Sequence, residues 1–154
     1  MLYSALKPGG WIELQELRFH LSCDDGTLKP GDPVEDWMKT VGRGMAAMGV
    51  NVLAMEKNPE NLLAAGFANI TERRFKLPLG VWPRDPKMKM IGLYNRSIIF
   101  DGLHGISIGA CTRGLKWAPD EVEAFLVGVR RALFNARVHS YLPFHAVIGQ
   151  KPPT

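Results

Sequence analysis

Cysteine is scarce in this sequence, and long apolar runs are missing from it. Only Cys23 and Cys111 occur among 154 residues, which is too few for the disulfide framework of a small secreted protein. No stretch approaches the roughly 20 consecutive apolar residues of a transmembrane helix. The first residues also lack the basic flank and long apolar core of a secretory signal. We therefore expect a protein without a membrane partner, in a reducing compartment such as the cytoplasm.

Several functional signatures are lacking as well. The net charge of +4 comes from scattered lysines and arginines without interleaved aromatic residues, which does not favour a nucleic-acid partner. No spacing of His, Cys and Asp is typical of a zinc site. Neither a phosphate-binding loop nor a serine nucleophile turn is present. The sequence thus predicts no metal and excludes several common enzyme classes.

The hydrophobic pattern is that of one α/β domain covering residues 1–154, with 46% apolar and 22% charged residues. A helix end precedes Lys7-Pro8-Gly9, and an apolar strand covered on both faces is expected from Trp11 to Phe19. Helices are expected from Asp32, Asn58, Asp85 and Pro119, and the third has glycines at Gly102 and Gly105 where a break is expected. Further strands are expected over residues 69–77 and 139–149. The order is helix tail, strand, helices, strand, helices, strand, which resembles the second half of a larger domain.

Five segments carry a family resemblance. They read LKPGGWIELQE, CDDGT, NLLAAGFANITERRFKLPLGVWPRDPKMKMIGLYNR, APDEVEAFLVGVRRAL and SYLPFHAVIGQKP. In this order they are similar to the C-terminal half of fungal LaeA-like proteins with the class I methyltransferase fold. The resemblance implies a truncated Rossmann-like α/β fold with about three strands and several helices, forming the wall that binds the methyl acceptor.

The resemblance also implies that the cofactor site lies elsewhere. Members of the family bind S-adenosylmethionine on a glycine-rich turn after their first strand, and an acidic residue after the next strand holds the ribose. Neither motif is present here, and Gly42-Arg43-Gly44 falls within a helical pattern. No cofactor is expected unless a partner chain supplies the missing half. An uncovered strand edge favours pairing with another chain, so we expect a homodimer that completes the sheet, or an N-terminal partner.

Candidate functional residues follow from position. Ligands of open α/β sheets bind beyond the carboxyl ends of strands, which selects Glu16, Asp24 and Asp25 as polar groups and His20 as a general base. The alternative is that Asp24-Asp25-Gly26 is only a turn and His20 only a loop residue. His145 lies on the last strand, and faces either the pocket or the sheet surface.

The long helix contributes a second group of candidates. By resemblance it covers the acceptor pocket, where Tyr94 and Asn95 would donate hydrogen bonds to a carbonyl and Arg96 would bind substrate or form an ion pair. His104 is a candidate acid or base, or a helix-end residue at a kink. Trp37 is a candidate wall residue of an apolar pocket, or part of the core. The set of catalytic candidates is therefore His20, Tyr94, His104 and His145.

Three functions remain open. The first is a cofactor-independent cyclase or isomerase of the pericyclase type, which would hold a polyketide-like or other apolar small molecule in a reactive conformation. The second is an S-adenosylmethionine-dependent methyltransferase, present as a fragment or as one chain of two. The third is a non-catalytic module that regulates a related methyltransferase.

Overall fold

The computed structural model describes residues 2–153, which form five α-helices, two short non-α helical turns and four strands. The chain divides into two compact units. Unit 1 contains the residues up to Arg18, Leu53–Phe75 and the residues from Phe144 onward, and unit 2 contains Phe19–Val52 and Lys76–Pro143. The elements are α1 (Leu2–Ala5), β1 (Trp11–Leu17), β2 (Ser22–Cys23), α2 (Pro33–Ala47), η1 (Ala54–Lys57), α3 (Asn58–Ala64), β3 (Ala68–Pro78), α4 (Pro86–Gly109), η2 (Ala110–Gly114), α5 (Pro119–Ala132) and β4 (Ser140–Gln150).

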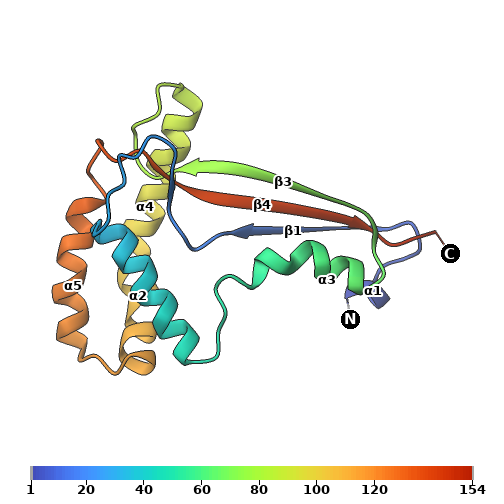
Figure 1. The fold of residues 1–154 in the computed structure, drawn as a ribbon, viewed down its shortest axis with the longest axis horizontal. Helices are drawn as coiled ribbons and strands as arrows, with labels where there is room; N and C mark the ends of the chain where they lie inside the picture. Colours follow the sequence, from blue (N-terminus) through green and yellow to red (C-terminus); the bar gives the residue numbers. More distant parts are fainter. Residues whose placement is uncertain (1, 154) are drawn as a thin grey trace. The chain divides into compact units, whose positions relative to one another are not determined.

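The α/β class and the main helices and strands are confirmed, whereas the short strand β2 is an addition to the three strands expected. β1 and β2 pair with β4 in antiparallel register, and β3 pairs with β4 as well (Figure 1). Among the described strands, β1 pairs only with β4. Its other edge therefore offers unpaired backbone groups.

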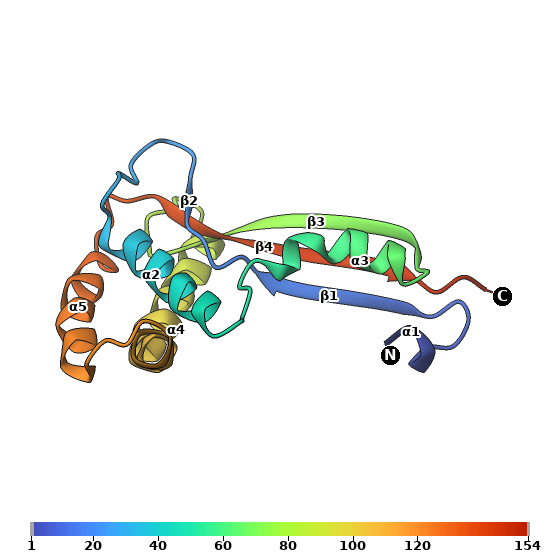
Figure 2. The same ribbon diagram turned by 60° about the horizontal axis from the view of Figure 1, so that its bottom comes forward.

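In unit 1, one face of the sheet is covered and the other is open. Val147 lies opposite Leu14 and packs against Leu62 of α3 and against Phe67, and Figure 2 shows α3 running along the strands. On the opposite face Trp11 is 55% exposed, and Leu17 and Phe75 are also exposed. The expectation that this strand is covered on both faces is therefore wrong for the described residues, because α3 packs on one face alone.

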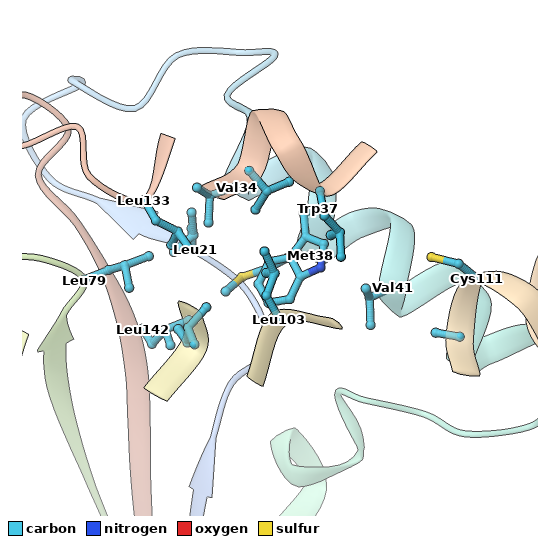
Figure 3. Close-up of a cluster of buried hydrophobic side chains, with 14 of the residues drawn as sticks. Leu21, Val34, Trp37, Met38, Val41, Leu79, Leu103, Cys111, Leu133 and Leu142 are labelled. Carbon is cyan, nitrogen blue, oxygen red and sulfur yellow. The ribbon is translucent and has the colours of Figure 1, made fainter. Parts of the chain in front are cut away.

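In unit 2, three helices with amphipathic sequences enclose the main core. α2, α4 and α5 pack side by side, as Figure 1 shows, and bury a cluster of apolar side chains (Figure 3). Trp37, Leu103 and Leu126 are completely buried there. Burial of one such side chain contributes about 1.5 to 3 kcal/mol, so this cluster is a major source of the stability of unit 2.

Local sequence signals explain where these helices begin. The Asp32 carboxylate accepts hydrogen bonds from the N–H groups of Val34 (2.9 Å) and Glu35 (3.3 Å), and Asp85 does the same for Met88 (2.8 Å). α5 has alanine at its N-cap, and the Glu121 side chain instead accepts from the N–H of Ala118 at 2.7 Å. α4 continues as a helix through Gly102 and Gly105, so the interruption expected there is absent.

Close backbone packing requires glycine where α2 meets the end of α4. A Cβ atom at Gly44 would lie 2.3 Å from the carbonyl oxygen of Ala110, and one at Gly114 would lie 2.1 Å from the carbonyl oxygen of Gly44. Gly42-Arg43-Gly44 thus lies inside α2, and Gly44 serves helix packing.

Candidate functional site

Asp24 lies just beyond β2, where the sequence predicts polar groups. It accepts hydrogen bonds from the Tyr141 hydroxyl at 2.8 Å and from the Lys76 ammonium at 2.5 Å. The Lys76 hydrogen bond is the main cause that lowers the pKa of Asp24, with a further contribution from Tyr141. The same contact raises the pKa of Lys76. Both carboxylate oxygens of Asp24 are therefore occupied within the protein.

Asp25 is held even more tightly. Its Oδ1 accepts from the Thr27 hydroxyl (2.8 Å), the Thr27 N–H (3.1 Å) and the Cys23 thiol (3.2 Å), and its Oδ2 lies 2.5 Å from Nδ1 of His139. The Thr27 hydroxyl, followed by His139, places the pKa of Asp25 far below its usual value. The His139 ring in turn stacks on Trp82 with centroids 5.1 Å apart. This network joins the loop after β2 to the start of β4.

His20 does not take part in this network. Its side chain is exposed, and the partners of Asp24 and Asp25 described above do not include it. The sequence argument therefore missed His139 as the histidine beside the carboxylates. His139 and Asp25 are separated by 114 residues, so no local pattern in the sequence indicates their contact.

The candidates on α4 contact different parts of unit 2. Tyr94 is 62% exposed, and the Asn95 amide donates to the carbonyl of Pro78 at 2.9 Å, which ties α4 to the end of β3. The Arg96 guanidinium lies 4.5 Å from the ring centre of Phe134. Asn95 and Arg96 thus have structural contacts in the described residues.

His104 also lies on α4, where its Nδ1 is 2.5 Å from a carboxylate oxygen of Glu123 on α5. Hydrogen bonds from His104, first, and Arg130 lower the pKa of Glu123. Trp37 is completely buried, and its indole N–H donates to Ser107 at 2.7 Å. Trp37 therefore belongs to the core, and the interpretation as a pocket wall is corrected because no face of the ring is accessible.

Two candidates belong to unit 1. His145 is buried on β4 with Nδ1 2.6 Å from a carboxylate oxygen of Glu72, and Glu16 is its partner in the β1–β4 register. The pKa of Glu72 is lowered by Arg74 first and by His145 second, although desolvation opposes both. Within the described residues, His104 and His145 pair with different carboxylates, on α5 and β3, and not with each other. The catalytic roles of the four candidates stay predictions.

A groove of about 500 Å³ lies in unit 2. α2 contributes Met45, the residue after its C-terminal end is Met48, and α4 contributes Gly105 and Ile106. Arg113 adds a cation from η2. Both methionines continue the three- and four-residue spacing of the apolar positions in this helix, which is typical of core residues, yet they are only half-buried, and periodicity does not reveal that depth.

The two strand-to-helix loops of unit 2 use their glycines and carboxylates in contacts within the chain. Gly80 follows β3 and precedes α4 with φ +100°, yet its N–H bonds to the carbonyl of Gly92, and a Cβ at Gly92 would clash with the Gly80 oxygen. In the other strand-to-helix loop, Asp24, Asp25 and Asp32 are occupied as described above. Neither loop therefore offers a free glycine-rich cradle together with a free carboxylate.

Residues 2–153 lack two further kinds of feature. No group of three or more His, Cys, Asp or Glu side chains there is placed to hold a metal ion. None of the helices described is long and apolar enough to cross a membrane.

Known proteins similar to this chain come from fungi. A probable methyltransferase, tdiE of Emericella nidulans, is 34% identical over 97% of this chain and 47% of its own length. Methyltransferase pytC of Aspergillus terreus is 33% identical over 97% of this chain and 46% of its own length. The secondary metabolism regulator LAE1 of Cochliobolus heterostrophus is 33% identical over 98% of this chain and 50% of its own length.

No protein-family model matches the sequence. The chain spans about half the length of these curated relatives. The chain is thus similar along almost its whole length to fungal methyltransferases and LaeA-like regulators, which is consistent with the C-terminal part of a LaeA-like methyltransferase-fold protein.

Proposed function

We propose that this chain provides the acceptor-binding part of a methyltransferase of fungal secondary metabolism. The observation that carries the proposal is the groove of about 500 Å³ in a chain that matches methyltransferases along nearly its full length. Sites for small molecules are concave, mostly apolar and of this size. The described residues would bind and orient an apolar acceptor, exclude water from it, and leave donor binding to the other half of the fold.

The open edge of β1 is where the completing half would join. A strand edge with unpaired backbone groups accepts a further strand, and the exposed Trp11, Leu17 and Phe75 on the neighbouring face supply apolar area. A second copy of this chain is the other occupant of that edge, which would give the homodimer predicted from the sequence.

Calorimetry with S-adenosylmethionine tests the methyl-transfer proposal. We expect no binding heat with this chain alone, and binding after co-expression with the N-terminal half of the tdiE relative. Binding by the chain alone would contradict the conclusion that neither strand-to-helix loop offers a free glycine-rich cradle together with a free carboxylate. No binding by the co-expressed halves, if they co-purify, would overturn the proposal.

A second candidate function is cofactor-independent cyclisation or isomerisation. The groove favours it because every lining residue comes from this chain, so a substrate can be held without another half. His20, Tyr94, His104 and His145 are the proposed acids, bases or donors, and their variants to Ala or Phe should lower turnover without changing the oligomeric state.

Product mass separates the two functions. The chain is incubated with metabolites extracted from a fungal strain that lacks its gene, with and without the co-expressed half and S-adenosylmethionine. A product that keeps the mass of its precursor supports cyclisation or isomerisation, and one that gains a CH₂ unit supports methyl transfer. Conversion in neither sample would leave the regulatory role, which the name of the LAE1 relative suggests.

A further inference from the structure

One wall of the groove, formed by α4, has no side chain at Gly105. A Cβ atom at Gly105 would meet nothing within 4 Å, whereas the neighbouring Ile106 is 39% exposed. Across from them, Met45 of α2 and Met48 just after it are half-buried. The missing side chain at Gly105 therefore keeps the groove open, and flexible methionines allow its opposite wall to adapt to a bound molecule.

Arg113 is the one charged residue that lines this groove, as far as the described residues show. No hydrogen bond or ion pair of its side chain is found within residues 2–153. Its guanidinium lies back over α4, because a Cβ at Gly109 would be only 2.8 Å from Nη2. The groove thus combines apolar walls with an unpaired cation that has no carboxylate among its lining neighbours.

The position of Arg113 depends on the turn that carries it. The N–H of Leu115 donates to the carbonyl of Ala110 at 3.2 Å, which is the five-residue spacing of a π-helical turn. Gly44 and Gly114 let the backbones of α2 and this turn come into close contact. Arg113 is therefore mounted on a turn fixed against a second helix, and such a support suits a ligand-binding residue.

We infer that this groove binds an organic anion, in which a carboxylate or enolate oxygen pairs with Arg113 and an apolar, ring-sized body lies between the methionines and Gly105. A guanidinium binds a carboxylate through two parallel N–H···O bonds, and Arg113, which is exposed to solvent, has no competing acid among the residues that line the groove. The inference deepens the proposed function, and rests on it only for the identity of this ligand as the methyl acceptor.

Two probes of nearly equal shape test the charge requirement. Purified full chain is titrated with 2-naphthoate and with the uncharged 2-naphthamide, after its mass in solution has been measured. We expect the anion to bind at least about tenfold more tightly than the amide. Equal affinities, or no binding of naphthoate at millimolar concentrations, would overturn the inference.

Variants locate the binding. Arg113→Gln should reduce the affinity for naphthoate to that for naphthamide, while the matched charge removal Arg131→Gln on α5 should leave both unchanged. Gly105→Leu should abolish binding of both probes without lowering the melting temperature, because the new side chain enters open space in a helix. Binding that survives in Gly105→Leu would overturn the assignment to this groove.

Two further outcomes separate this inference from others. A wild-type dimer that becomes a monomer in Gly105→Leu would show that a second copy fills the groove, and would overturn the ligand assignment. Binding of naphthoate without any methyl transfer by the co-expressed halves would overturn the proposed function and leave the anion site in place. Methyl transfer by the co-expressed halves without naphthoate binding would overturn the anion site and leave the proposed function in place.

Discussion

The indole nitrogen of Trp37 lies 2.7 Å from the hydroxyl oxygen of Ser107, and both side chains are completely buried in unit 2. Ser107→Ala leaves the indole N–H without an acceptor, which should lower the free energy of unfolding by about 1 to 3 kcal/mol. Urea unfolding of the variant measures this change. In a Trp37→Phe background the same substitution should cost clearly less, and an equal cost in both backgrounds would contradict the role of the hydrogen bond.

Gly44 is a second test of the core. Gly44→Ala forces a Cβ to within 2.3 Å of the Ala110 carbonyl oxygen, so a backbone must move, and we expect a loss of about 1 to 3 kcal/mol or more. Gly128→Ala on α5 is the matched control, because open space surrounds its Cβ and helix propensity favours alanine by about 1 kcal/mol. Thermal unfolding should move in opposite directions for the two variants.

Asp25 should make the free energy of unfolding depend on pH. Because its pKa is lower in the folded than in the unfolded protein, the ionised carboxylate stabilises the fold fully above the usual value of 3.8, and progressively less as the pH falls toward the folded pKa. Asp25→Asn should therefore lower the free energy of unfolding more at about pH 5 than at about pH 3. Urea unfolding at the two pH values measures the difference, and a larger effect in the more acidic buffer would contradict the assignment.

The open sheet face of unit 1 should mediate association. Replacing Trp11 and Leu17 together by Glu places charge on that face, and we expect association with the co-expressed half, or with a second copy, to weaken at least about tenfold. Leu63→Glu is the control, since Leu63 is 67% exposed on α3 and away from this face. Sedimentation velocity checks both variants, and equal effects would show that general charge is responsible.

Local signals in the sequence predicted most of the fold. Asp32, Asp85 and Pro119 each mark the beginning of a helix, because capping and proline geometry act over a few residues. Gly66 ends α3 with φ +93° for the same local reason. The three long strands also follow from apolar patterns of sufficient length.

Local patterns in the sequence could not predict the long-range contacts. His139 joins Asp25 only because β4 pairs with β2, and a pattern of a few residues contains no information on that pairing. The groove depends on the depth to which Met45 and Met48 enter the interior, and spacing alone assigns a helix face without its depth. The complete burial of Trp37 also depends on how the helices pack against one another, so its spacing in the sequence left both a core position and a pocket wall open.

The π-helical turn at residues 110–114 positions Arg113 in the groove, and a change of one codon in the gene can alter this turn. Such a turn holds one residue more than the α-helical turn it replaces, so a single inserted or deleted codon interconverts the two. Deleting Thr112 would restore an ordinary turn, rotate the following residue by about 100° around the helix axis, and remove the cation from the apolar walls. The charge selectivity that we infer for this groove would thus be lost in one mutational step.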